Sequence, residues 1–244
     1  MRGPAWLVLP TFNEAENLER IVTAARGVLA AAAAGGFRIL VVDDGSPDGT
    51  GAIADRLAAA HPGEVEVLHR TTREGLGPAY LAGFRHALDA GAGAVMEMDS
   101  DFSHDPADLA RLLAPIQAGT ADLALVSRYT PGGGVSDWGL GRRFISRGGC
   151  LYAQAVLQAP VRDLTGGFKC FRAEVLEAID LPTVRSRGYA FQVELTYRAL
   201  RRGFRVVEVP IVFRDREEGE SKMSWKIAAE AIWLVPALRL RRRS

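Results

Sequence analysis

The sequence predicts an α/β fold with a mostly parallel sheet and helices on both faces. Short, largely apolar runs at residues 5–10, 37–42 and 94–98 have the length and composition of strands buried on both faces. Segments of helical periodicity alternate with these runs, and turn residues follow the runs directly. The 244 residues fit one α/β domain, and 48% hydrophobic against 24% charged residues supply a large core.

The first predicted strand, residues 5–10, ends at a proline and is followed by a helix. Asn13 as N-cap with Glu16 three residues later forms a capping-box pattern, and apolar residues at helical spacing continue it to a Gly-Gly pair. The second strand, residues 37–42, runs into a cluster of turn residues that precedes another helix.

The next two strands and their helices follow the same order. Residues 64–69 are predicted as a strand and, after a loop, residues 79–88 as a helix. The fourth strand, residues 94–98, precedes Asp105 as N-cap with Pro106 at the first helical position, which is a favoured combination. Strands and helices in alternation predict right-handed crossovers.

The second half of the chain is predicted to continue the fold, because no repeat or low-complexity linker divides it. The predicted elements are a strand at 122–126, an aperiodic loop at 130–140, a helix from Arg142 to Val156, a short strand after 163–169, helices from Ala173 and Gly188, a strand at 206–213 and a charged loop at 214–222. Pro210 places the last strand at an edge of the sheet, because proline has no amide hydrogen for a neighbouring strand.

The C-terminal segment has an apolar and aromatic pattern with a basic end. Residues 225–240 are too short to span a bilayer. An amphipathic interfacial helix with a basic end would lie on an anionic membrane surface, and the alternative is a last helix packed on the core. The chain is therefore divided into a main α/β domain of residues 1–222 and a tail of residues 223–244.

Charge and cysteine content exclude several classes of protein. Thirty Lys and Arg against 29 Asp and Glu give a net charge of +1, so we expect no nucleic-acid partner. Cys150 and Cys170 lack the spacing of zinc or redox motifs and are expected to be buried thiols. The N-terminus enters the first strand without a signal sequence, which predicts a cytoplasmic protein.

Acidic residues stand where two predicted strands end. Asp99 and Asp101 follow the strand at 94–98, and Asp43 follows the strand at 37–42. Open α/β sheets bind ligands at this edge, and Mg²⁺ is usually held by one or two carboxylates together with substrate phosphates. Later loops supply cations for phosphates at Arg128, Arg216 and Lys222. Since neither a Gly-x-Gly-x-x-Gly turn nor a P-loop follows the first strand, the pattern favours another kind of site for a nucleoside diphosphate and a metal ion.

Several stretches resemble family 2 glycosyltransferases with the GT-A fold, namely residues 10–14 (PTFNE), 42–46 (VDDGS) and 99–101 (DSD). Other stretches narrow the resemblance to polyprenol (dolichol) monophosphate mannose synthases, namely 127–129 (SRY), 163–168 (DLTGGF), 188–192 (GYAFQ) and 219–224 (GESKMS). The resemblance implies inverting transfer of mannose from GDP-mannose to a polyprenyl phosphate, with Mg²⁺ or Mn²⁺ as cofactor.

The resemblance also implies roles for individual residues. The positions that hold the guanosine of GDP-mannose in the family are occupied here by Pro10, Thr11, Glu14, Asp43 and Asp44. The metal-binding carboxylates match Asp99 and Asp101, with Ser100 between them in the donor site. The cations around the diphosphate and the acceptor phosphate match Arg128, Arg216 and Lys222, and these three together with Asp101 are the expected catalytic residues.

Ser103 marks a departure from part of the family. Archaeal members have glutamine two residues after the second carboxylate, whereas this chain has Ser103, as other bacterial members do. Ser103 is therefore either a third metal ligand or a turn hydroxyl. His104 is expected to cap the turn rather than bind a metal, because the four histidines lack paired spacing.

Three other functions fit parts of the sequence. The nearest is a polyprenyl-phosphate glucosyltransferase that uses UDP-glucose. A phosphoacceptor receiver domain also has acids at strand ends, but it is about half this size. A lipid-binding module without catalysis is the third. Family members often carry transmembrane helices after the catalytic domain, whereas residues 225–240 of this sequence are too short to span a bilayer. We therefore expect peripheral attachment at the cytoplasmic face of a membrane or a separate membrane-anchoring partner.

Overall fold

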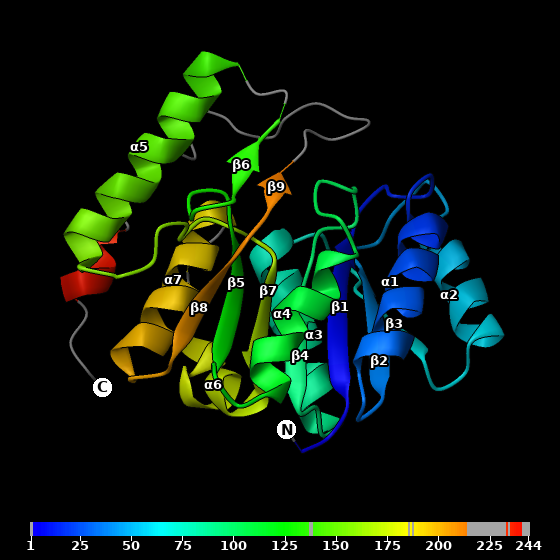
Figure 1. Ribbon diagram of the computed structural model, residues 1–244. Coiled ribbons are helices and arrows are strands. Elements are labelled where there is room, and N and C mark those ends of the chain that lie inside the picture. Colours follow the sequence, from blue (N-terminus) through cyan, green and yellow to red (C-terminus); the bar gives the residue numbers. More distant parts are fainter. Residues whose placement is uncertain are drawn as a thin grey trace.

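The computed structural model has an α/β architecture in which a central sheet lies between two layers of helices (Figure 1). The structure describes residues 2–136, 139–184, 186, 188–213, 233 and 235–240. The predicted mostly parallel sheet with helices on both faces is confirmed.

A seven-stranded sheet forms the centre of the protein. Its strands are β1 (Ala5–Thr11), β2 (Phe37–Asp43), β3 (Val65–His69), β4 (Ala94–Glu97), β5 (Leu123–Ser127), β7 (Lys169–Arg172) and β8 (Val206–Pro210). They lie in the order β3-β2-β1-β4-β7-β5-β8, and β7 runs antiparallel to both of its neighbours. The chain moves outward from β1 to β3 and then returns to β4 on the other side of β1. The sheet therefore has a topological switch point between β1 and β4, where open α/β sheets bind ligands.

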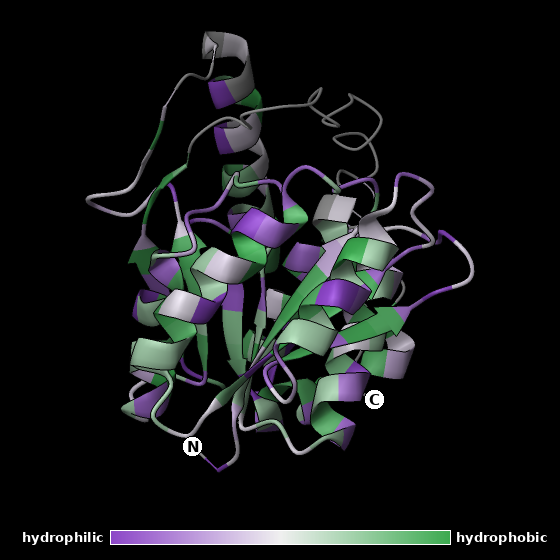
Figure 2. Cartoon of the chain, turned by 90° about the vertical axis from the view of Figure 1, so that its right-hand side faces the viewer, coloured by the Kyte–Doolittle hydropathy of each residue, from purple (hydrophilic) through white to green (hydrophobic). Residues whose placement is uncertain are grey.

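The helices divide between the two faces of the sheet. They are α1 (Leu18–Ala32), α2 (Thr50–Ala60), α3 (Leu76–Asp89), α4 (Asp108–Gln117), α5 (Leu140–Leu157), α6 (Ala173–Ala178) and α7 (Gly188–Arg201). Helices α1, α2 and α4 pack with Leu7 and Val41 on one face, and α3, α6 and α7 pack with Val8 and Val42 on the other. Neighbouring strand residues point to opposite faces, so each apolar strand contributes to both cores. Figure 2 shows these hydrophobic strands between helices that carry hydrophilic residues.

Gly83 allows α3 to approach the sheet closely. A Cβ atom at this position would overlap Cγ1 of Val8 and lie 3.1 Å from Cγ2 of Val42. We expect Gly83→Ala to lower the free energy of unfolding by about 1–3 kcal/mol, because overpacking outweighs the roughly 1 kcal/mol gain in helix propensity.

The control for this prediction is Gly27→Ala in α1. A Cβ atom at Gly27 would meet nothing within 4 Å, so only the propensity gain applies, and we expect stabilisation of up to about 1 kcal/mol. Urea unfolding measures both variants. A Gly83→Ala protein as stable as the Gly27→Ala protein would contradict the close approach of α3 to the sheet.

The start of α1 differs from the predicted capping box. The helix begins at Leu18, five residues after Asn13, and Asn13 has a φ of +59°. The amide of Asn13 donates a hydrogen bond to Oγ of Ser46 (3.1 Å), in the loop after β2. The prediction of Asn13 as N-cap was wrong, because a contact between two loops sets the conformation that the local pattern assigned to a helix start.

The last predicted strand is broken after its proline. β8 ends at Pro210 and forms an edge of the sheet, which confirms the edge position predicted from that residue. β9 (Val212–Phe213) pairs in parallel with β6 (Gly134–Val135), inside the stretch that was predicted as a loop. β6 and β9 therefore form a second small sheet, which stands above the top of the main sheet in Figure 1.

The C-terminal segment is described in part, and this part is helical at Trp233 and residues 235–240. Val235 and Leu238 are buried in a cluster with α5 and α7, whereas Trp233 is 82% exposed. This short stretch is amphipathic and has one side packed on the protein. The predicted division after residue 222 lies outside the described residues. Within the described part of the chain, no helix has the length and apolar character needed to cross a membrane.

Candidate active site

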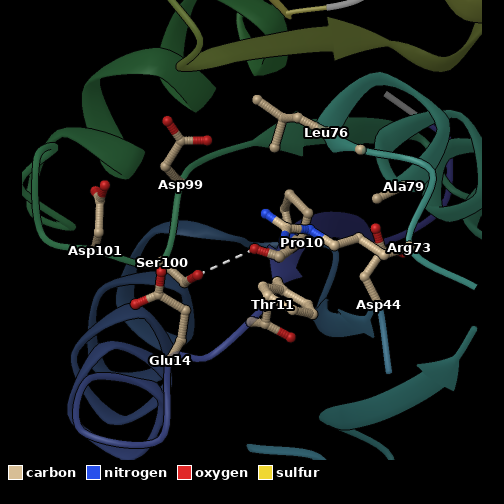
Figure 3. A pocket seen from close by; sticks show the side chains of 12 residues that line it. Pro10, Thr11, Glu14, Asp44, Arg73, Leu76, Ala79, Asp99, Ser100 and Asp101 are labelled. Carbon is tan, nitrogen blue, oxygen red and sulfur yellow. Dashed lines mark hydrogen bonds between the residues drawn. The ribbon is translucent and has the colours of Figure 1, made fainter. Parts of the chain in front are cut away.

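A pocket lies at the switch point between β1 and β4 (Figure 3). It is lined by Pro10, Thr11, Phe12 and Glu14 from the end of β1, Asp44 after β2, Arg73, Gly75, Leu76 and Ala79 at the start of α3, and Asp99, Ser100 and Asp101 after β4. Residues as distant in the sequence as Pro10 and Ser100, which are 90 positions apart, therefore meet at one edge of the sheet, as expected for the carboxyl ends of parallel strands.

The carboxylates of Asp99 and Asp101 point to the same side, and Ser100 between them points away (Figure 3). The Ser100 hydroxyl donates to the carbonyl oxygen of Pro10 (3.0 Å), which joins the end of β4 to the end of β1. Oδ1 of Asp101 accepts a hydrogen bond from the amide of Ser103 (3.0 Å). Side chains alternate in direction from the strand into this loop, so Asp99 and Asp101, which are two positions apart, point to the same side.

This pair of carboxylates fits a hard divalent cation that is shared with a substrate. In the part of the chain that the structure describes, no group of three or more His, Cys, Asp and Glu residues could hold a metal ion by itself. Two carboxylates suffice for Mg²⁺ when substrate phosphates and water complete the coordination. Ser103 is buried and does not line the pocket, so its hydroxyl as a third ligand stays a prediction.

Hydrogen bonds between the loops after β1 and β2 fix the position of Glu14. The amide of Glu14 donates to Oγ1 of Thr50 (2.9 Å), and this hydroxyl donates to Oδ1 of Asp48 (2.6 Å). Oδ2 of Asp48 accepts from the amide of Ala15 (3.1 Å). Asp48 therefore anchors the two loops to each other, and Glu14 is held at the pocket.

The two adjacent acids after β2 have different surroundings. Asp44 lines the pocket and forms an ion pair with Arg70, which also pairs with Glu74. Asp43 is 4% exposed and does not line the pocket, and its Oδ1 accepts a hydrogen bond from the Ser46 hydroxyl (2.5 Å). Asp44 therefore lies in the pocket, whereas Asp43 has the contacts of a turn residue. A contact between Asp43 and the guanosine expected at this site stays a prediction.

Phe12 and Arg73 line the pocket but were not among the predicted site residues. The guanidinium carbon of Arg73 lies 3.8 Å from the centre of the Phe12 ring. Figure 3 shows Arg73 across the pocket from Asp101. Planar cations and aromatic rings are both surfaces on which nucleotide bases stack. Arg73 could have been predicted as a site residue from its position in the loop after β3, because that strand ends at the same edge of the sheet.

Arg128 does not line the pocket, and its side chain is bound to Asp163. Its Nε and Nη2 each lie 2.7 Å from an oxygen of Asp163, and Nη2 also donates to Oγ1 of Thr165 (2.8 Å). Burial opposes the charge of Arg128, but the Asp163 carboxylate outweighs burial and raises the pKa of the guanidinium. A phosphate contact of Arg128 stays a prediction. Arg216 and Lys222 lie outside the described residues.

His104 packs between two phenylalanine rings. The centre of its ring lies 5.1 Å from that of Phe168 and 5.2 Å from that of Phe213. Its Nδ1 is buried and has no hydrogen-bond partner among the described residues. Burial lowers the pKa of His104 from 6.5 to about 4, so the imidazole is neutral in the folded protein at neutral pH.

We expect the protein to lose stability as the pH falls below 6.5, because His104 then binds a proton in the unfolded state but not in the folded state. Between pH 7 and pH 4.5 this one group contributes a loss of about 2–3 kcal/mol. Urea unfolding at the two pH values measures the loss, and His104→Phe should reduce it by that amount. The same pH dependence in the variant would show that His104 is not buried in its neutral form.

The comparison with known families agrees with this fold. Residues 6–180 match the family described as Glycosyl transferase family 2. The chain therefore belongs to glycosyl transferase family 2 and has a GT-A-like fold.

Two curated relatives are similar over nearly the whole chain. Polyprenol monophosphomannose synthase of Mycolicibacterium smegmatis is 49% identical over 237 residues, which are 97% of this chain and 87% of that protein. Undecaprenyl-phosphate mannosyltransferase of Micrococcus luteus is 48% identical over 225 residues, which are 92% of this chain and 89% of that protein. These relatives confirm the resemblance to polyprenol monophosphate mannose synthases.

Solved structures with the same fold include complexes of glucosyl-3-phosphoglycerate synthase from Mycobacterium tuberculosis. The complex with Mn²⁺, UDP and glucosyl-3-phosphoglycerate has a TM-score of 0.70 at 18% identity, and the match covers 100% of this chain and 82% of that one. The complex with Mg²⁺ and UDP has a TM-score of 0.69 at 16% identity, with 100% and 81% covered. At these identities the likeness concerns the fold, and it confirms the predicted GT-A architecture.

Proposed function

We propose that this protein transfers mannose from GDP-mannose to a polyprenyl phosphate, with inversion at the sugar carbon. The 49% identity to a polyprenol monophosphomannose synthase over 97% of the chain carries the proposal. The pocket at the switch point supports it, because Asp44, Asp99 and Asp101 meet there in a place suited to a nucleotide and a cation.

The protein must stabilise the charge that develops on the leaving group. As the bond between the sugar and the diphosphate breaks, the nucleoside diphosphate gains negative charge. A bound Mg²⁺ or Mn²⁺ supplies positive charge at this point. Asp99 and Asp101 would hold the ion. Ser100 and the amide of Ser103 keep this loop in place through their hydrogen bonds, so the acids need little reorganisation during the reaction.

The acceptor phosphate needs no general base from the protein. A phosphate monoester with a second pKa of about 6 is mostly dianionic at neutral pH and is already a nucleophile. Its attack from the side opposite the diphosphate inverts the configuration of the sugar carbon. In this proposal Arg128, Arg216 and Lys222 orient the diphosphate and the acceptor phosphate, and for Arg128 the bonds to Asp163 fix the direction of the guanidinium.

The proposal assigns the guanosine to the side of the pocket formed by Asp44, Phe12 and Arg73. One oxygen of Asp44, Oδ1, is bound by Arg70, and the second remains an acceptor for the N–H groups of guanine. The Phe12 ring and the Arg73 guanidinium offer flat surfaces for the base.

The polyprenyl acceptor brings the protein to a membrane surface. On α5, Phe144 is 76% and Ile145 is 59% exposed, and the neighbouring Arg143 is also exposed. This end of α5 projects from the body of the protein (Figure 1). A cation at an anionic membrane surface contributes about 1 kcal/mol to binding. We propose that this end of α5 and the C-terminal tail rest on the cytoplasmic face of the membrane, alone or with a separate anchoring protein.

The test is incubation with GDP-mannose, Mg²⁺ or Mn²⁺ and a short polyprenyl phosphate. We expect a polyprenyl phosphate mannose, detected by mass spectrometry, with the anomeric configuration opposite to that of the donor in NMR spectra. Transfer from UDP-glucose but not from GDP-mannose would establish the alternative glucosyltransferase. No transfer to the lipid from either donor would contradict the proposed function.

A further inference from the structure

Behind Asp99, the side of the site that faces α3 and α7 contains buried polar groups that the proposed reaction does not use. Tyr80 of α3 is fully buried, and its hydroxyl donates a hydrogen bond to Oδ1 of Asp99 (3.1 Å). The Tyr80 ring stacks on Phe84 and Phe191, with ring centres 5.7 and 6.1 Å away. Packing on two rings fixes the direction of the hydroxyl, so this bond restrains the carboxylate.

Gln192 of α7 is the second buried group, and its amide has one orientation. Lys169 donates to the backbone oxygen of Gln192 (3.0 Å) and to its side-chain oxygen Oε1. Since a lysine ammonium has donors and no acceptor, the amide oxygen must face Lys169. The amide nitrogen Nε2 therefore points the other way.

Gly167 leaves the space between this amide and Asp99 open. A Cβ atom on Gly167 would lie 3.5 Å from Nε2 of Gln192 and 4.0 Å from Oδ2 of Asp99, so both groups border one small volume. Nε2 is buried and has no hydrogen-bond partner within the described residues. Its two hydrogens allow it to interact with the nearby carboxylate of Glu97 and still direct a donor toward Asp99.

We propose that Tyr80 and Gln192 are positioning residues for Asp99, with Tyr80 restraining Oδ1 and Gln192, oriented by Lys169, restraining the side of Oδ2. The inference rests on the proposed function, in which Asp99 binds a divalent cation together with a nucleoside diphosphate. Partners of a metal-binding carboxylate set its orientation, and losing one typically weakens metal affinity by about 10–100-fold.

The decisive variants are Tyr80→Phe and Gln192→Met. The first keeps the ring and its stacking and removes only the hydroxyl, and the second keeps the side-chain length and removes the amide. Mn²⁺ binding to the protein with saturating GDP is measured by electron paramagnetic resonance. We expect about 10-fold weaker Mn²⁺ binding in each variant, unchanged GDP binding without metal, and a kcat within about 2-fold of wild type at saturating Mn²⁺.

Tyr197→Phe is the matched control, since Tyr197 is a buried tyrosine of α7 whose hydroxyl accepts a hydrogen bond from Arg201 (3.2 Å). It should bind Mn²⁺ as wild type does. Wild-type Mn²⁺ affinity in both Tyr80→Phe and Gln192→Met would overturn the inference, and if one variant fails to fold, the other decides. If the wild-type protein itself forms no complex with Mn²⁺ and either GDP or UDP, the proposed function fails, which is a separate outcome.

Discussion

Replacing Asp101 by asparagine is expected to lower kcat/KM for mannosyl transfer by about 10³-fold, or roughly 4 kcal/mol of transition-state stabilisation. Asp101 lines the pocket, lies on the same side as Asp99, and is held by the amide of Ser103. Asparagine can keep that hydrogen bond but removes the negative charge that would hold the cation. The substitution therefore separates the electrostatic role of the carboxylate from its structural role. Steady-state kinetics with varied Mn²⁺ measures the effect.

Asp105→Asn is the control for this prediction. Asp105 is an exposed acid four residues further along, outside the pocket lining, and its Oδ1 accepts a hydrogen bond from the amide of Ala107 (2.9 Å), which asparagine can also accept. It should keep wild-type activity. If Asp101→Asn retained more than a tenth of wild-type kcat/KM, Asp101 would not be a ligand of the ion.

Replacing Lys169 by methionine is expected to destabilise the protein by about 3–5 kcal/mol at pH 8. Glu97 and Lys169 are both fully buried, and Nζ lies 3.4 Å from Oε1. Within the described residues, Lys169 is the cation that pairs with Glu97, so removing it leaves a buried carboxylate without a compensating charge. Burial raises the pKa of Glu97 to about 7 even beside Lys169, and protonation therefore limits the cost at lower pH. Urea unfolding at pH 8 and pH 6 should show the larger loss at pH 8.

The double variant Glu97→Gln/Lys169→Met provides the control for the charge. It removes both charges at similar volume, so we expect it to recover most of the stability lost at pH 8 and to show little dependence on pH from this site. The expected loss of unfolding free energy at pH 8 is roughly 3–5 kcal/mol. If urea unfolding instead shows a loss of less than about 1 kcal/mol for Lys169→Met, the charge of Lys169 does not compensate Glu97 in the folded state.

The order of strands and helices was largely predictable because it depends on local patterns. Apolar runs such as residues 5–10 became strands near their expected bounds, since a segment of that composition is stable only when it is buried on both faces. Pro210 ended β8 at a sheet edge because its missing amide hydrogen is a local property. Helix starts were less predictable: the first helix begins at Leu18 because loop contacts, rather than Asn13, decide its entry.

Sequence alone determined which residue types gather at the ligand-binding edge, and the tertiary structure decided which of them face the pocket. Asp43, Asp99 and Asp101 were predicted to be at this edge because parallel strands end there. Asp99 and Asp101 do line the pocket, whereas after β2 it is Asp44, which the family resemblance named, and not Asp43 that lines it. The ion pair of Arg128 with Asp163 joins residues 35 positions apart, and Tyr80 meets Asp99 through the packing of α3 on the sheet. Such partners depend on how distant elements pack, a relation that no local pattern encodes, and packing therefore decided the surroundings of each charged group.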